Sequence, residues 1–157
     1  MSSFRIRALD PDYLDEVRAR GEDDFGNDVV ATTNDDAGGT PLRCCLREAA
    51  VGERVALIAH RAASIGGPYV EIGPVFIHAE RCAGYLATGA YPEGFRHRQL
   101  VFRAYDARGR QVGNRIAEAG AGAESVIGEL LSQPEVAYLH ARNVLAGCFM
   151  FTVERGE

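Results

Sequence analysis

The sequence predicts a single α+β domain in which about three helices pack on one mostly antiparallel, curved β-sheet. The chain has 157 residues, the usual size of one domain. Its 46% hydrophobic and 25% charged residues are typical of a globular protein. Several short segments alternate apolar and polar residues between turns, and strands and helices do not alternate regularly as in a parallel α/β fold. We therefore treat residues 1–157 as one domain.

The N-terminal part predicts a strand, a helix and a long loop. Residues 4–9, FRIRAL, alternate in character and predict a strand. Asp10 and Pro11 suit the N-cap and first position of a helix over 11–20, which Gly21 would end. Residues 21–40 are rich in turn and acidic residues and predict an irregular segment, either mobile or folded over a site as a lid.

The middle of the chain predicts two strands and a short helix. The strands cover residues 54–60 and 75–79, the second beginning after Pro74. Residues 80–88 carry Cys82, Tyr85 and Leu86 at helical spacing, which predicts a helix of one or two turns.

The C-terminal part predicts two hairpins around a helix. Residues 100–105 alternate and lead into a turn at 106–109, where Gly109 supplies positive φ. Residues 123–133 predict an amphipathic helix that Pro134 ends. Residues 135–142 and 148–155 predict the last two strands.

Composition limits the partners. A net charge of −5 argues against nucleic acid, and no run of 18 apolar residues predicts a membrane span. The N-terminus lacks the apolar core of a signal peptide, so we expect a cytoplasmic protein with reduced thiols. The Gly-Pro steps match no nucleotide-binding loop, and we predict no cofactor.

Four ordered motifs resemble the bacterial family called domain of unknown function 1203. They are PLRCCLREAAVGE, PYVEIGPVFI, RAYDARG and HARNVLAGC, and the resemblance spans about residues 40–155. It implies a small bacterial protein. It supplies no established activity, cofactor or catalytic residue.

The last motif contains a candidate catalytic set. Cys148 would be the nucleophile, His140 the base and Asn143 the residue that orients the imidazole. This requires a hairpin register that places His140 and Cys148 on one face. The alternative is a buried thiol that behaves as a small hydrophobe, with His140 bonded to a backbone carbonyl.

Arginines next to polar residues suggest a pocket for an anion. Arg43 precedes Cys44, where a guanidinium would lower the thiol pKa and hold an anion, or would simply form a surface ion pair. Cys44 and Cys148 could also form a reversible redox pair if they are close in space.

Further candidates for this pocket follow the middle strands. Arg103 lies within a strand and would bind a ligand or pair with Glu53 or Glu71. Asp106 would line the pocket or cap the turn. The other candidate ligand-binding residues are Tyr69, Arg98 and Tyr105.

The histidines and cysteines predict no metal site, because no HxH, HxxxH or HExxH pair exists and the cysteine spacing matches no zinc pattern. The leading hypothesis is therefore a protein that binds an anionic small molecule. The alternatives are a thiol enzyme and a homodimeric interaction protein that pairs through an edge strand.

Overall fold

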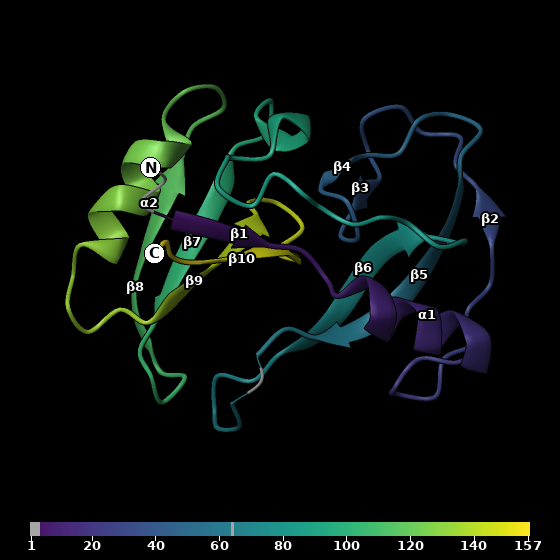
Figure 1. Cartoon of the computed structure of the whole chain (residues 1–157), viewed down its shortest axis with the longest axis horizontal. Helices are drawn as coiled ribbons and strands as arrows, with labels where there is room; N and C mark the ends of the chain where they lie inside the picture. Colours follow the sequence, from purple (N-terminus) through teal and green to yellow (C-terminus); the bar gives the residue numbers. More distant parts are fainter. Residues whose placement is uncertain (1–3, 64) are drawn as a thin grey trace.

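The computed structural model describes residues 4–63 and 65–157 and contains two five-stranded sheets, one in each half of the molecule (Figure 1). The first sheet has the order β1-β10-β9-β7-β8 and is antiparallel throughout. Its strands are β1 (Phe4–Arg7), β7 (Leu100–Tyr105), β8 (Gln111–Ala117), β9 (Tyr138–Asn143) and β10 (Phe149–Arg155). The α+β class and the antiparallel pairing are confirmed, but the expectation of one sheet is wrong.

The second sheet has the order β2-β5-β6-β3-β4. Its strands are β2 (Thr32–Thr33), β3 (Pro41–Leu42), β4 (Arg47–Glu48), β5 (Arg54–Arg61) and β6 (Ile72–His78). Pairing is antiparallel except between β3 and β6, which run parallel at Leu42 and Phe76. The short β3–β4 hairpin thus lies at one edge of this sheet, and its loop carries Arg43, Cys44 and Cys45.

The helix α1 (Pro11–Arg20) has the predicted bounds and caps. The Asp10 carboxylate accepts a hydrogen bond from the Asp12 N–H, and Gly21 ends the helix at a φ of 73°. Leu14 and Val17 are its buried residues, and they pack into the core of the second sheet.

The described residues contain two α-helices, because the predicted helix over 80–88 is wrong. α2 (Ala123–Leu131) packs on the first sheet, and η1 (Glu93–Phe95) is a short 3₁₀ turn. Residues 82–88 are irregular: Gly84 has a φ of 89°, and Leu86 is 82% exposed, so the segment has no buried helical face. No helix in the described ranges is both long and apolar enough to cross a bilayer.

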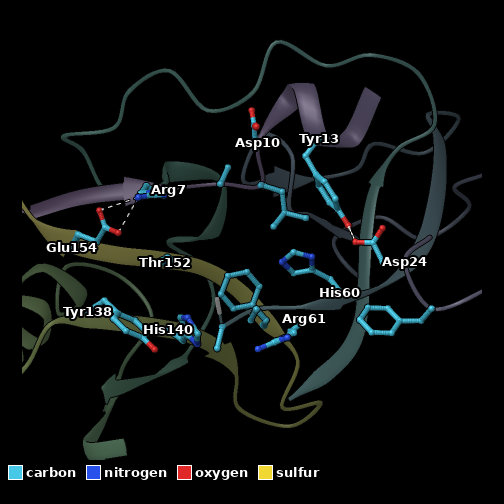
Figure 2. Close-up of a pocket in the computed structure, with 16 residues that line it drawn as sticks. Arg7, Asp10, Tyr13, Asp24, His60, Arg61, Tyr138, His140, Thr152 and Glu154 are labelled. Atoms are coloured by element: carbon cyan, nitrogen blue, oxygen red, sulfur yellow. Dashed lines mark hydrogen bonds and ion pairs between the residues drawn. The ribbon is translucent and has the colours of Figure 1, made fainter. Parts of the chain in front are cut away.

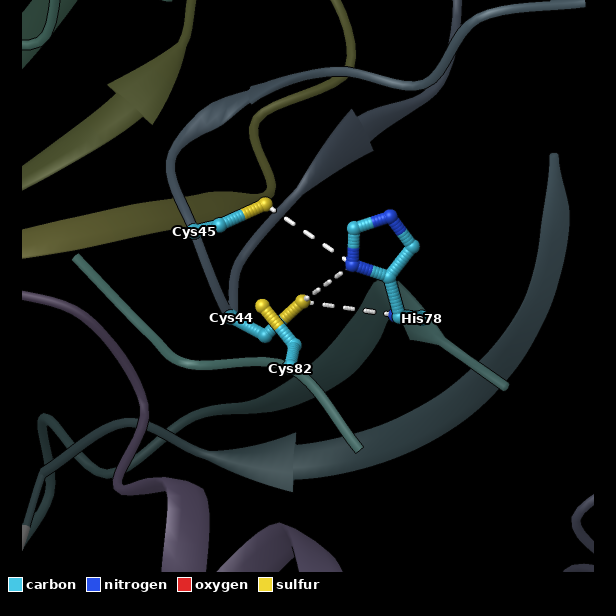
Figure 3. Close-up of side chains that lie close together, drawn as sticks. All are labelled: Cys44, Cys45, His78 and Cys82. Atoms are coloured by element: carbon cyan, nitrogen blue, oxygen red, sulfur yellow. Dashed lines mark hydrogen bonds between the residues drawn. The ribbon is translucent and has the colours of Figure 1, made fainter. Parts of the chain in front are cut away.

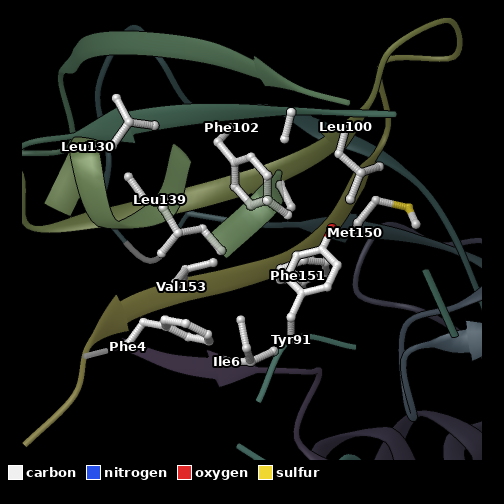
Figure 4. Close-up of a cluster of buried hydrophobic side chains, with 14 of the residues drawn as sticks. Phe4, Ile6, Tyr91, Leu100, Phe102, Leu130, Leu139, Met150, Phe151 and Val153 are labelled. Carbon is white, nitrogen blue, oxygen red and sulfur yellow. The ribbon is translucent and has the colours of Figure 1, made fainter. Parts of the chain in front are cut away.

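The core of the first sheet is aromatic at its centre (Figure 4). The Phe151 ring lies 5.9 Å from Tyr91, 6.4 Å from Phe95 and 6.2 Å from Phe102, measured between centroids. The aliphatic residues around them include Ile6, Leu100, Leu130, Leu139 and Val153.

Two side chains cross between the halves. Leu46, from the β3–β4 loop of the second sheet, is buried in the core of the first. Phe149, from β10 of the first sheet, is buried in the core of the second. Leu46 has a φ of 60°, a left-handed conformation that a leucine adopts only when its surroundings hold it there. This exchange makes the two halves one body.

The segment 21–40 is mostly irregular, as predicted, but it also contains β2. Asp23 anchors it to the second sheet by accepting a hydrogen bond from the Ala59 N–H at 2.8 Å. The Asn34 side chain donates to the carbonyls of Ala49 and Ala50. The mobility of this segment stays a prediction.

Candidate functional site

The β9–β10 hairpin decides which of the predicted catalytic residues meet. Asn143 and Cys148 face each other: the Asn143 N–H donates to the Cys148 carbonyl at 3.0 Å, and the Asn143 amide donates to the Cys148 sulfur at 3.1 Å. A bulge between Phe149 and Phe151 shifts the register, and His140 lies opposite Thr152. The structure therefore brings Cys148 to Asn143 and does not bring it to His140.

His140 is enclosed by aromatic rings instead. Its centroid lies 5.0 Å from Tyr105, 5.2 Å from Tyr138 and 5.0 Å from Phe149. Burial, followed by the positive charges of Arg142 and Arg103, lowers the pKa of His140 to about 3. Its Nδ1 atom has no hydrogen-bond partner among the described residues. The ring is a neutral member of an aromatic cluster, in tilted or edge-on contact with its neighbours.

The partner of Cys148 on its other side is Arg43, whose side chain is 1% exposed. The Arg43 guanidinium donates to the Cys148 sulfur at 3.0 Å, to the Phe149 carbonyl at 2.7 Å and to the Pro41 carbonyl at 2.5 Å. Within the part of the chain that the structure describes, no carboxylate forms an ion pair with this guanidinium. A buried cation without an acidic partner is unusual.

Arg98 extends the same network from the loop before β7. It binds Glu48 at 2.5 and 3.0 Å and donates to the Asn143 side-chain oxygen at 2.9 Å. A cleft of about 540 Å³ opens beside these groups, and we call it the arginine cleft. Its polar lining includes Arg43, Arg98, Gln99, Asn143 and Cys148, and its apolar lining includes Leu57, Pro74, Phe76, Val144 and Leu145.

The other predicted binding residues lie outside this cleft. Arg103 pairs with Glu71 at 3.0 Å, one of the two partners that the sequence suggested, and Glu71 also binds Arg142 at 2.6 Å. Tyr105 stacks on Tyr138 at 5.3 Å between centroids.

Asp106 and Tyr69 also have other positions. Asp106 caps the β7–β8 turn by accepting hydrogen bonds from the N–H groups of Arg108 and Arg110. Tyr69 is 47% exposed and lies apart from the arginine cleft.

A wider cleft of about 640 Å³ lies where the two halves meet, and its lining includes Tyr13, His60, His140 and Phe149 (Figure 2). The Tyr13 hydroxyl donates to Asp24 at 2.5 Å, and burial lowers the pKa of His60. An ion pair at 3.0 Å holds Arg7 to Glu154. Two pairs in this wider cleft, Tyr13–Asp24 and Arg7–Glu154, are thus bonded to each other. The Tyr138 hydroxyl and His140 Nδ1, which also line it, have no hydrogen-bond partner among the described residues.

Four side chains that the sequence did not connect form a compact group, which we call the thiol cluster: Cys44, Cys45, Cys82 and His78 (Figure 3). Their ligating atoms all lie within 4.8 Å of one another. Cys44 thus turns toward His78, at 3.5 Å, and not toward the neighbouring Arg43 guanidinium or Cys148. All four cysteines of the chain are free thiols.

The thiols of this cluster interact strongly. A hydrogen bond with Cys45 and another from the His78 N–H, opposed by burial, lower the pKa of Cys44 to about 5. The same bond to Cys44, together with burial, raises the pKa of Cys45. Burial raises the pKa of Cys82. One negative charge is therefore concentrated on Cys44.

One spacing could have revealed this cluster. His78 and Cys82 are four residues apart, a separation that zinc sites use, but this pair combines a histidine with a cysteine, whereas the patterns considered above are pairs of histidines or sets of cysteines. The contribution of Cys44 and Cys45 depends on the contact between the β3–β4 loop and β6, which no local pattern predicts.

Comparison with known proteins places the chain in one family. No curated protein and no solved structure matches it. A family model matches residues 39–155, which agrees with the resemblance of the sequence motifs and includes the thiol cluster and the polar lining of the arginine cleft. The chain therefore belongs to the family described as "Protein of unknown function (DUF1203)".

Proposed function

We propose that this protein binds a small organic anion in the arginine cleft, with Cys148 at the contact point. The observation that carries the proposal is the buried Arg43 guanidinium, which among the described residues has two carbonyls and a thiol as hydrogen-bond partners but no bonded carboxylate. Glu48 acts on it only through space, so its charge contributes a positive potential in a site of low dielectric.

The shape and lining of the cleft support a ligand with an acidic head and an apolar body. Its volume of about 540 Å³ lies in the range of small-molecule sites. Arg98, Gln99 and Asn143 form the polar side. Arg98 is paired with Glu48, Gln99 with Glu118 and the Asn143 amide with Cys148, so a carboxylate would have to take over N–H donors from these partners. Leu57 and Leu145, which are 49% and 100% exposed, would cover the apolar body.

A second candidate function is thiol chemistry at Cys148. Its sulfur accepts hydrogen bonds from a guanidinium and an amide, and a thiolate accepts such bonds better than a thiol does. Because His140 lies elsewhere, Arg43 and Asn143 take the supporting roles in this version. The homodimer through an edge strand stays a prediction; β1, β8, β2 and β4 are the edge strands of the two sheets.

Two alkylating reagents of similar size test the proposal. Iodoacetate is an anion and iodoacetamide is neutral, so the ratio of their rates at Cys148 reports attraction of the anion independently of thiol reactivity. We expect this ratio to exceed that of the urea-unfolded chain by roughly 5- to 30-fold at low ionic strength, which corresponds to about 1–2 kcal/mol. Peptide mass spectrometry resolves Cys148 from the other cysteines.

Variants and competition complete the test. Arg98→Gln should reduce the ratio, whereas Arg115→Gln, at an exposed arginine on β8, should not change it. Octanoate, as a carboxylate with an apolar body, should protect Cys148 from iodoacetamide better than octanol does. A ratio equal to that of the unfolded chain would refute anion binding, and a fast reaction with both reagents would favour thiol chemistry.

A further inference from the structure

The thiol cluster combines ligands from three separate segments. Cys44 and Cys45 come from the β3–β4 loop, His78 ends β6, and Cys82 lies in the connection that leads from β6 to the first sheet (Figure 3). Cys44 is buried and the other three are half-buried. Three thiols and one imidazole are a donor set that soft and borderline transition metals prefer.

The distances fit a tetrahedral site that needs only a small contraction. Around a tetrahedral Zn²⁺, two thiolate sulfurs lie about 3.8 Å apart and a sulfur and a nitrogen about 3.5 Å apart. The His78 Nδ1 atom lies 3.5 Å from the Cys44 sulfur and 3.9 Å from the Cys45 sulfur. All four ligating atoms lie within 4.8 Å of one another, so rotation of one side chain would bring the most separated pair to the distance that a shared metal ion requires.

The second nitrogen of His78 is held as in metal sites. Its Nε2 atom lies 2.6 Å from a Glu53 oxygen, and because a carboxylate only accepts, Nε2 carries the proton. Nδ1 then presents its lone pair to the three thiols. Glu53 is fixed in turn by Arg47 at 2.7 Å and by the Ala50 N–H at 3.0 Å. A carboxylate behind a ligating histidine orients the ring and increases its basicity.

Backbone and charge also suit bound thiolates. The His78 N–H donates to the Cys44 sulfur at 3.3 Å, and the Gly84 N–H donates to the Cys82 sulfur at 3.4 Å. Three thiolates with Zn²⁺ carry one negative charge, and Glu53 carries another. The Arg47 guanidinium, which binds Glu53 and lies 3.4 Å from His78 Nε2, offsets one of these two charges.

We propose that Cys44, Cys45, Cys82 and His78 bind one Zn²⁺ ion through their sulfur atoms and Nδ1. Four protein ligands close the coordination shell, which is typical of a structural site and leaves no position for a substrate. The ion joins the β3–β4 hairpin to β6 and to the connection between the two sheets. Since Leu46 of this hairpin is buried in the first core, the metal also fixes that side chain in place.

Cobalt titration of the reduced protein tests the site directly. We expect the wild type to bind one Co²⁺ with the visible bands of tetrahedral coordination and near-ultraviolet thiolate charge transfer, and Zn²⁺ to displace it. In Cys45→Ser and Cys82→Ser, which keep two thiols and the imidazole, the charge-transfer bands of the cobalt-loaded protein should become weaker, and Zn²⁺ binding should weaken at least tenfold. Cys148→Ser, which removes the thiol outside the cluster, should keep the bands and the affinity.

A second measurement needs no variant. Zn²⁺ should protect Cys44, Cys45 and Cys82 of the wild type from iodoacetamide and leave Cys148 reactive, and it should raise the melting temperature. The proposal is overturned if folded, reduced protein gives no thiolate bands with Co²⁺, if the bands keep their full intensity and the affinity is unchanged in Cys45→Ser and Cys82→Ser, or if Zn²⁺ protects all four thiols equally. A disulfide within the cluster of the native protein, with no metal binding after reduction, also overturns it.

Discussion

The thiol cluster and the arginine cleft lie on either side of one short hairpin, and they place the same residue type in opposite settings. Arg43 and Cys44 are consecutive, yet the first donates to Cys148 and the second contacts His78. In the arginine cleft a single sulfur receives hydrogen bonds from a cation and an amide. In the thiol cluster three sulfurs lie around one imidazole, and the hydrogen bond between two of them lowers the pKa of Cys44 and raises the pKa of Cys45.

The difference shows that the residue next to a cysteine in sequence does not set its chemistry. Arg43 and Cys44 lie in the turn between β3 and β4, where successive side chains point in different directions, so Arg43 cannot be assigned to Cys44 from adjacency. What matters is the element across from each side chain: β10 for Arg43 and β6 for Cys44. On the two proposals made above, one site stabilises negative charge and the other supplies it to a cation.

The largest effect on stability should follow from Arg43→Met, which removes the buried guanidinium of the arginine cleft and keeps all residues of the thiol cluster. The change leaves the carbonyls of Pro41 and Phe149 without their donor in a buried site, and we expect a loss of about 3 kcal/mol or more in the free energy of unfolding. Urea denaturation measures it, with Arg115→Met as the exposed control. A loss under about 1 kcal/mol would contradict the central position of this guanidinium.

The second largest effect on stability should come from His140, which lines the wider cleft and, unlike His78 of the thiol cluster, is enclosed by aromatic rings. The folded pKa of about 3 lies below the value of about 6.5 in an unfolded chain, so the unfolded state takes up a proton first as the pH falls. The neutral ring therefore makes its full contribution to the free energy of unfolding above about pH 6.5. This contribution falls as the pH decreases toward about 3, and about 3 kcal/mol of it is lost at pH 4.

The substitution His140→Phe tests this pH dependence. It keeps a ring in the aromatic cluster with Tyr105 and Tyr138 but cannot be protonated. The unfolding free energy of the variant, measured at pH 7 and pH 4, should fall less between them than that of the wild type. The exposed His97→Gln is the matched control, and equal slopes for wild type and His140→Phe would contradict the assignment.

Much of the fold could be predicted because its signals are local. Asp10, Pro11 and Gly21 determine the ends of α1, and Gly109 the turn between β7 and β8, within a few residues of sequence. The prediction of a helix over 80–88 failed because Cys82 and Tyr85 pack against different cores and Leu86 is exposed, so the three do not form one buried helical face. The division into two sheets depends on long-range strand pairing, which local alternation does not contain.

The candidate sites were less predictable for the same reason. The partners Asn143 and Cys148 follow from hairpin register, and one bulge removed His140 from the set. The Arg103–Glu71 pair was anticipated because a half-buried arginine in a strand needs an acid. The thiol cluster requires three segments to converge, and only the spacing of His78 and Cys82 gave a signal.

Glu53→Gln should weaken metal binding at the thiol cluster moderately and leave the arginine cleft unchanged. Gln keeps the size of the side chain but weakens its hold on His78 Nε2 and on Arg47. On the basis of the proposed metal site, we expect the Zn²⁺ dissociation constant to rise roughly 10- to 100-fold. Competition with a chromophoric chelator measures it, and Glu80→Gln, at an exposed ion pair, is the control. A change under twofold would mean that Glu53 does not support the histidine.

The smallest effect on stability should come from Leu145→Asp at the rim of the arginine cleft. Leu145 is fully exposed, so its replacement should change the unfolding free energy by less than about 0.5 kcal/mol. The proposed ligand, however, loses apolar cover and meets a negative charge, so octanoate should protect Cys148 from iodoacetamide several-fold less well. Leu86→Asp, at an exposed leucine outside the cleft, is matched in chemistry and should leave protection unchanged. If octanoate protects Cys148 equally in both variants, the apolar side of the cleft does not contact the ligand. Recognition then depends on Arg43, Arg98 and their neighbours alone.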